Sequence, residues 1–127
     1  MLELAARSIG GLCSRVLRFP DGISLEEMVL ANALGPPAPR HHAARPCGVL
    51  MLPIPQPGVL RAVDGRTDAA ATPGITGLTI TIPIGQRVQP LPEGDRYLGF
   101  IFAESDTHEN VEKALGAARE RLRIVIQ

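Results

Sequence analysis

The stretch RYLGFIFAESDTHENVEKALGAARERLRIVIQ, residues 96–127, decides the fold because it predicts a strand, a helix and a second strand in succession. Residues 96–105 are strongly apolar, which is typical of a buried strand. Asp106 and Thr107 follow as caps for a helix, and residues 123–126 (RIVI) predict a closing strand. The apolar stripe of the helix consists of Val111, Leu115, Ala118 and Leu122.

The preceding residues predict further strands and a short helix. CGVLMLPI, residues 47–54, is a nearly continuous apolar run, as expected of a strand covered on both faces. The segment ITGLTITIP alternates apolar and polar residues and predicts a half-buried strand. Between strands, residues 85–95 are turn-rich, with a local ion pair expected between Asp95 and Arg96. The remaining expected elements are a strand at 58–65, a short helix at 66–72 and the alternating strand at 75–83.

Residues 47–127 therefore predict the order β-β-α-β-β-α-β. Short connections between consecutive strands favour antiparallel neighbours, with the helices collected on one face. The predicted fold class is α+β, a small antiparallel sheet with two or three helices on one face.

The first 46 residues contain one helix with clear signals. Ser24 and Glu27 form an S-x-x-E capping box, and Gly35 is expected to end the helix in a left-handed conformation. Residues 36–46 are rich in proline and predict an exposed linker. For residues 12–19, a strand and a short helix both fit.

Composition limits the classes of function. Thirteen basic and thirteen acidic residues give a formal net charge of zero, so we expect neither nucleic acid nor an anionic membrane as a partner. No apolar run approaches the roughly 20 residues that span a bilayer. The first residues lack a signal-peptide pattern, and we expect a cytoplasmic protein with free thiols at Cys13 and Cys47.

The opening LELAARSIGG places a carboxylate and a guanidinium four residues apart, at Glu3 and Arg7. Residues an even number apart on a strand share a face, so both side chains can point into one groove. A carboxylate suits Mg²⁺, and a guanidinium binds phosphoryl or carboxylate oxygens through two parallel bonds. Spacing alone favours a surface salt bridge between the two side chains.

The segment LELAARSIGGLCSRVLRF resembles the last strand and loop of the catalytic fold of ATP-grasp enzymes, and SLEEMVLANALG resembles the helix that follows. The later segments GVLMLPIPQPGVLRAVDG and PGITGLTITIPIGQRVQPLPEGDRYLGFIFAES resemble the small C-terminal domain of the L-amino-acid ligase branch. That branch consists of ATP-dependent carboxylate–amine ligases, distantly similar to biotin carboxylase. The resemblance implies an incomplete end of the ATP-grasp domain at 1–35, the linker at 36–46 and a small α+β domain at 47–127.

By this resemblance, Glu3 corresponds to a Mg²⁺ ligand and Arg7 to a catalytic arginine that steadies the acyl phosphate. Gly10 and Gly11 correspond to positions beside the substrate carboxylate. Ala5 stands where many relatives have a metal-binding asparagine, which leaves Glu3 as the only ligand from this strand. The implied cofactors are ATP and Mg²⁺, and the implied substrates are an amino acid or another carboxylate, together with an amine.

A complete phosphate cradle is not expected within these 127 residues. Catalysis of this kind depends on positioning and electrostatic stabilisation, yet the chain has a single lysine, Lys113, and no G-x-x-x-x-G-K-[ST] motif. We therefore expect a C-terminal fragment that lacks the upstream ATP-grasp lobes, is inactive alone and binds ATP weakly.

Two alternatives remain from the residues. One is a free-standing interaction module that forms a homo-oligomer through exposed sheet edges. The other is a metal site that uses the two cysteines together with His41 and His42, although their spacing matches no zinc pattern.

Overall fold

The computed structural model describes residues 10, 12–17, 19, 22–35 and 45–127. The chain divides into two compact units, Met1–Ala44 and Arg45–Gln127, which are described separately here. In the described part of the chain, no helix has both the length and the apolar character required to cross a bilayer.

The described residues of the first unit contain a 3₁₀ turn, η1 (Cys13–Val16), and one α-helix, α1 (Leu25–Leu34). Of the two alternatives for residues 12–19, the structure has the short helical one. The capping box is confirmed: the Glu27 amide donates to Ser24 Oγ at 3.2 Å, and the Ser24 amide donates to Glu27 Oε2 at 2.7 Å. The left-handed ending at Gly35 is wrong, because Gly35 is extended (φ −138°) and its amide already donates to Ala31 O.

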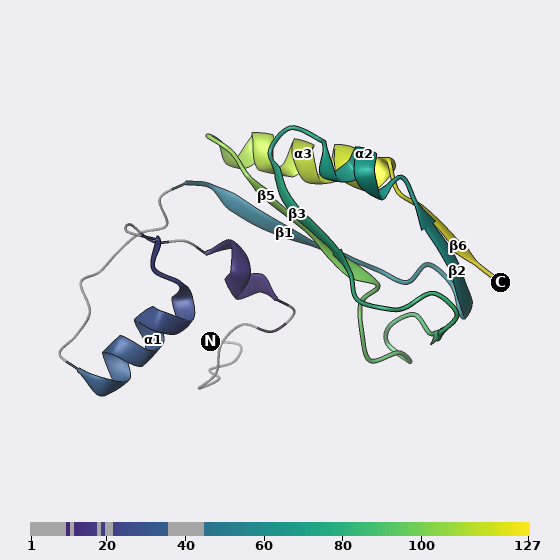
Figure 1. Cartoon of the computed structure of the whole chain (residues 1–127), viewed down its shortest axis with the longest axis horizontal. Coiled ribbons are helices and arrows are strands. Elements are labelled where there is room, and N and C mark those ends of the chain that lie inside the picture. The colour runs from purple at the N-terminus through teal and green to yellow at the C-terminus, as the bar shows by residue number, and fades with distance from the viewer. Residues whose placement is uncertain (1–9, 11, 18, 20–21, 36–44) are drawn as a thin grey trace. The chain divides into compact units, whose positions relative to one another are not determined.

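The second unit is an α+β domain, and the predicted fold class is confirmed (Figure 1). Its strands and helices, in chain order, are β1 (Cys47–Leu52), β2 (Gly58–Asp64), α2 (Arg66–Ala70), β3 (Ile75–Ile80), β4 (Arg87–Val88), β5 (Gly99–Glu104), α3 (His108–Glu120) and β6 (Arg123–Ile126). The sequence predicted every one of these elements except β4, although it placed the ends of several strands two or three residues too far out.

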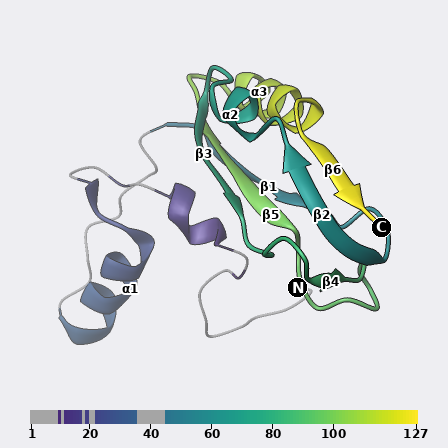
Figure 2. The ribbon, with the colours of Figure 1, turned by 45° about the vertical axis from the view of Figure 1, so that its right-hand side comes forward.

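The strands form two three-stranded antiparallel sheets, ordered β1-β5-β3 and β4-β2-β6. The sequence predicted one sheet. The segment between β1 and β2 explains the difference, because Pro53, Pro55 and Pro57 each lack the amide donor that would continue pairing. The chain therefore leaves the first sheet after Leu52 and enters the second at Gly58 (Figure 2).

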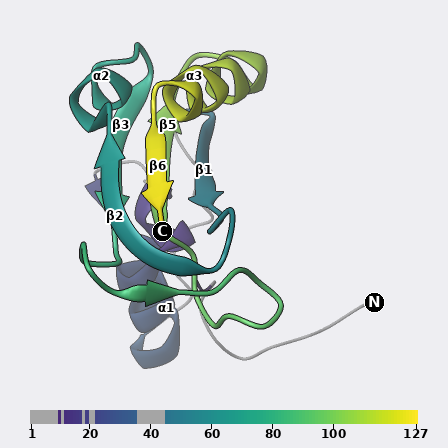
Figure 3. The same ribbon diagram turned by 90° about the vertical axis from the view of Figure 1, so that its right-hand side faces the viewer.

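Helices α2 and α3 lie on one face of the β1-β5-β3 sheet, as Figure 3 shows end-on. The central strand β5 is buried along almost its whole length, with Ile101 and Ala103 fully inaccessible. Side chains alternate between the two faces of a strand, so Phe100 and Phe102 lie on the face away from Ile101, where their rings stack with centroids 6.4 Å apart. The edge strand β1 is less covered than predicted, because Met51 is 36% exposed.

The main hydrophobic core joins the two sheets and α3. Its buried members come from both sheets, from the loops and from both helices: Leu52, Ile54, Leu60, Val63, Ala69, Ile82, Val88, Leu98, Ile101, Ala118, Leu122 and Ile126. A smaller cluster of Ala103, Val111 and Ala114 lies between β5 and α3. This common core holds the short strand β4 and its flanking loops, which form the site described next.

Candidate functional site: a pocket beside strand β4

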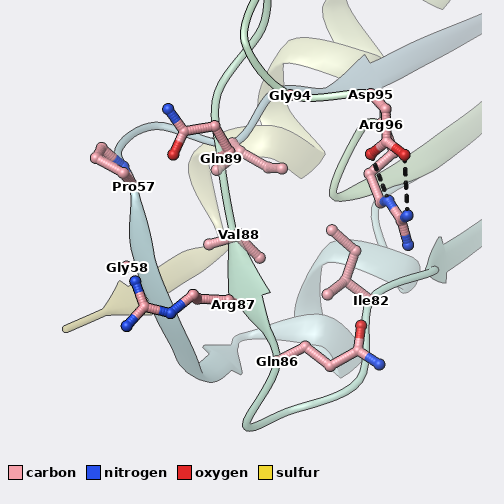
Figure 4. A pocket seen from close by; sticks show the side chains of 11 residues that line it. Pro57, Gly58, Ile82, Gln86, Arg87, Val88, Gln89, Gly94, Asp95 and Arg96 are labelled. Carbon is pink, nitrogen blue, oxygen red and sulfur yellow. Dashed lines mark hydrogen bonds and ion pairs between the residues drawn. The ribbon is translucent and has the colours of Figure 1, made fainter.

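A pocket of about 350 Å³ lies beside β4 in the second unit (Figure 4). Its lining comes from the end of the β1–β2 connection, from β4, and from the loops on either side of β4. The lining residues are Ile54, Pro57, Gly58, Ile82, Gln86, Arg87, Val88, Gln89, Gly94, Asp95 and Arg96.

The apolar part of this lining belongs to the domain core. Ile54, Ile82 and Val88 are each no more than 6% exposed. Val88 pairs with Gly58 across the β2–β4 ladder. Because the side chains of β4 alternate, Val88 is buried while its neighbour Arg87 is exposed. The pocket therefore has a fixed apolar floor beneath an exposed polar rim.

Asp95 and Arg96 form a two-point ion pair on one side of the pocket. Arg96 Nε donates to Asp95 Oδ1 at 2.8 Å, and a terminal nitrogen of the same guanidinium donates to Oδ2 at 3.0 Å. The hydrogen bond and the positive charge of Arg96 lower the pKa of Asp95, so this carboxylate stays ionised near neutrality. The local ion pair expected from the sequence is confirmed.

Gly94 fixes the loop that carries this pair. Its amide donates to Pro90 O at 2.7 Å, and a β-carbon on Gly94 would collide with the carbonyl oxygen of Gln89. A glycine is therefore needed for this close backbone approach. The turn holds Asp95 and Arg96 next to the end of β4.

A second, shallow hollow of about 390 Å³ lies between the α2–β3 turn and α3. The lone lysine Lys113 lines it, but its Nζ is 2.6 Å from Glu109 Oε1 one helical turn earlier. Arg45 makes another local ion cluster, with Glu104 at 3.4 Å and with Asp106. Both sets of ion pairs lie on the domain surface, and the charges of Lys113 and Arg45 are each paired with a neighbouring carboxylate.

The site residues predicted from the sequence are mostly outside the described part of the chain. Glu3, Arg7 and Gly11 lie outside it, so their proposed roles stay predictions. Gly10 is exposed in a turn, and a β-carbon there would meet nothing within 4 Å. His41 and His42 also lie outside the described residues; within these residues no three His, Cys, Asp or Glu side chains are arranged to hold a metal ion.

The sequence analysis did not predict the β4 pocket. It treated residues 85–95 as turns, although one signal was present: Gln86, Arg87 and Gln89 place three long hydrogen-bonding side chains around a single apolar residue, Val88. No local periodicity shows that Ile54, about thirty residues earlier, lies under the same site.

Comparisons with known proteins identify the domain. Residues 50–127, more than half of the chain, match the family model described as L-amino acid ligase C-terminal domain 2. A search of curated proteins gives no match. Among solved structures, the chain is similar to an L-amino acid ligase from Bacillus licheniformis, with a TM-score of 0.69 and 22% sequence identity.

That structural match covers 84% of this chain and 27% of the Bacillus chain, so this chain spans about a quarter of the protein that it resembles. The family match over residues 50–127 falls within the two-sheet α+β domain, and it agrees with the resemblance stated for the later segments of the sequence. The chain belongs to the L-amino acid ligase C-terminal domain 2 family.

Proposed function

We propose that this chain is the C-terminal portion of an ATP-dependent carboxylate–amine ligase, and that it does not catalyse ligation by itself. The observation that carries the proposal is the family match over residues 50–127. The likeness in fold to a ligase of which this chain covers only 27% also supports it.

In the proposed enzyme, an amino acid or another carboxylate is activated at the expense of ATP and is then joined to an amine. Mg²⁺ would supply charge neutralisation at the phosphate oxygens when bound. Glu3 is proposed as one of its ligands, and Arg7 as the group that steadies the phosphoryl oxygens by a two-point contact. Gly10 and Gly11 are proposed to lie beside the substrate carboxylate. We place this reaction in the cytoplasm, where ATP is available.

The missing part of the nucleotide site is proposed to lie on upstream ATP-grasp lobes. The bases immediately upstream of the first codon provide the test. The proposal expects an in-frame continuation that encodes a glycine-rich loop and further lysines. The purified longer polypeptide is expected to release ADP only when amino acids are present, and Glu3→Gln is expected to reduce this release at least tenfold. ADP release that is unchanged in Glu3→Gln would contradict the assigned role of Glu3.

A second candidate function, self-association through a sheet edge, is favoured by strand β1. Among the described strands, β1 pairs only with β5, in continuous register over six residues that include neither proline nor a charged side chain. The other edges are interrupted: β3 has an irregularity between Ile75 and Gly77, β4 has two residues, and β6 has four. An uninterrupted, uncharged edge is the type that pairs with another chain.

Sedimentation equilibrium tests this second function. Pairing through β1 predicts a mass that rises with concentration, and Met51→Lys is expected to restore the monomer because it puts a charge on the edge strand. Ile84→Lys is the matched control, since Ile84 is also an exposed large apolar residue but lies outside β1. A monomer at all concentrations up to about 0.5 mM, which corresponds to association weaker than about 4.5 kcal/mol, would rule the function out.

A further inference from the structure

The edge of β1 that no described strand covers presents hydrogen-bonding groups at alternate residues. At the start of the ladder, Pro46 O accepts a hydrogen bond from the Ser105 amide just beyond β5, so the backbone groups of the even-numbered residues point toward β5. In an antiparallel ladder this orientation alternates from residue to residue, and the β1–β5 register is continuous. The outward-pointing N–H and C=O groups are therefore those of Cys47, Val49 and Met51.

Helix α3 lies beside this edge. The helix contacts both β1 and β5, and Figure 3 shows it over the β1 side of the sheet, with α2 over the β3 side. A β-carbon on Gly48 would lie 3.3 Å from Cδ1 of Leu115, so Leu115 lies above β1, next to Val49. A second molecule that pairs with the β1 edge would therefore meet α3 as well as the strand.

One flank of α3 faces the β1 edge and carries two opposite charges. The other flank is identified by Asn110 and Ala117, which line the hollow beside the α2–β3 turn. With 3.6 residues per turn, Glu112 and Arg119 lie opposite these two, about one turn before and one turn after Leu115. Among the described residues Glu112 is exposed and has no hydrogen bond or ion pair, and the side chain of Arg119 makes only a 3.5 Å hydrogen bond to a backbone carbonyl.

We propose that two copies of this chain pair through β1 in an antiparallel, two-fold arrangement, with Val49 at the axis and Glu112 of each copy against Arg119 of the other. This inference rests on the self-association proposed above and specifies its geometry. The largest overlap of outward-pointing residues sets Val49 opposite Val49 and Cys47 opposite Met51, and each such pair exchanges two hydrogen bonds. The two β1-β5-β3 sheets then form one continuous sheet.

The same axis brings the two α3 helices together. Antiparallel two-fold pairing keeps both helices on one face of the joined sheet. Neighbouring strands are about 4.8 Å apart, and α3 lies over β1 and β5 together, so the two helix axes are about 10 Å apart, a distance at which helices pack. Because Leu115 lies close to the axis, Glu112 meets the partner's Arg119, and Arg119 meets the partner's Glu112. The interface is therefore complementary to itself in charge.

Charge reversal tests this geometry in the full 127-residue chain, with the dimer dissociation constant measured by sedimentation equilibrium. Glu112→Arg and Arg119→Glu each place like charges against each other twice, so each is expected to raise the dissociation constant by about tenfold or more. The double variant Glu112→Arg/Arg119→Glu restores opposite charges and is expected to return to about the wild-type value. Glu93→Arg makes the same change of net charge in the loop between β4 and β5, and is expected to dimerise as the wild type does.

The double variant separates charge pairing from damage to the fold, because restored association cannot result from a lower stability. A wild-type chain that stays monomeric would contradict self-association itself, and this geometry with it. A wild-type dimer whose dissociation constant is unchanged in both single variants, or a double variant that associates no better than the single ones, would overturn the geometry and leave self-association through β1 standing.

A disulfide tests the position of the axis. The α-carbons of a hydrogen-bonded antiparallel pair are about 5.5 Å apart, which is within the range that a disulfide bridges. In a Cys13→Ser, Cys47→Ser background, Val49→Cys is expected to give a covalent dimer on mild oxidation with copper–phenanthroline. Arg61→Cys, at an exposed position of β2, is the control and is expected to remain monomeric. Equal cross-linking of the two variants, or none with Val49→Cys, would contradict a two-fold axis at Val49.

Discussion

Gly48 of β1 and Val111 of α3 pack so closely that a β-carbon built on Gly48 would lie 2.8 Å from Cγ1 of Val111. This contact sets the distance between the helix and the first sheet, next to the small core cluster of Ala103, Val111 and Ala114. A branched valine side chain on a buried helix face has little freedom to move aside.

Gly48→Ala is therefore expected to lower the free energy of unfolding by about 1–3 kcal/mol, because overpacking displaces α3 from the sheet. Gly116→Ala is the matched control: Gly116 lies inside α3, and a β-carbon there would meet nothing within 4 Å. Alanine at that position is expected to raise the free energy of unfolding by about 0.5–1 kcal/mol. Urea denaturation measures both, and a destabilised Gly116→Ala variant would contradict the described packing of α3.

Thr107 caps the same helix. Its side-chain oxygen accepts a hydrogen bond from the Asn110 amide at 3.2 Å. Thr107→Ala is expected to lower the free energy of unfolding by about 1 kcal/mol, whereas Thr107→Ser, which keeps the hydroxyl, is expected to stay within a few tenths of a kcal/mol of the wild type. Equal melting curves for the two variants would show that the cap contributes nothing.

The Asp95–Arg96 pair is expected to change the pKa of the Asp95 carboxyl group by a measurable amount. Arg96 lowers the pKa of Asp95, so NMR titration of the Asp95 carboxyl is expected to give a value below that of an unpaired aspartate. Arg96→Gln is expected to raise the pKa of Asp95, and Arg87→Gln, which removes a charge from the same pocket without touching the pair, is expected to change it much less. A pKa unaffected by Arg96→Gln would contradict the two-point contact.

The Asp95–Arg96 pair also predicts the direction in which stability changes with pH. A carboxylate whose pKa is lowered by folding stabilises the protein above its unfolded-state pKa, and the contribution is lost as pH falls through the folded-state value. The stability difference between wild type and Asp95→Asn is therefore expected to be constant near neutral pH and to decrease in acid. It is expected to be small throughout, because both side chains are mostly exposed and solvent screens them.

Cys47 is expected to react slowly with thiol reagents. Partial burial, and secondarily the negative charge of Glu104, raise the pKa of its thiol, and the thiolate is the reactive form. In a Cys13→Ser background, the rate of alkylation by iodoacetamide near pH 8 is expected to increase when Glu104 is replaced by glutamine. A rate that is unchanged or lower in Glu104→Gln would contradict the electrostatic contribution of Glu104.

The sequence predicted the elements with strong local signals and missed the features that depend on distant contacts. The alternation in β3, the apolar run of β5 and the cap at Thr107 are local, and each of these elements formed, although β3 ends at Ile80 and β5 begins at Gly99, inside the expected bounds. Strand β4 was missed because its two residues, Arg87 and Val88, are too few to show any periodicity. Their pairing with β2 depends on residues about thirty positions earlier in the chain, which no local pattern reveals.

Two further differences between the sequence-based expectations and the structure also arise from features that no local pattern shows. Gly35 matched the composition of a left-handed helix end, but its amide reaches the Ala31 carbonyl with an extended backbone. The prolines after β1 showed where pairing stops, yet not that the chain then enters a second sheet. The pocket combines Ile54 with residues 82–96, and no motif predicts such a combination, because it depends on how two sheets share one core.

The central proposal is that this chain is part of a ligase and does not itself hold a working nucleotide site. Calorimetric titration of the purified 127-residue chain with Mg-ATP tests it most directly. The account predicts no binding tighter than about 1 mM, and no ADP release when amino acids are added. A micromolar dissociation constant, or ADP release that depends on an amino acid, would contradict it.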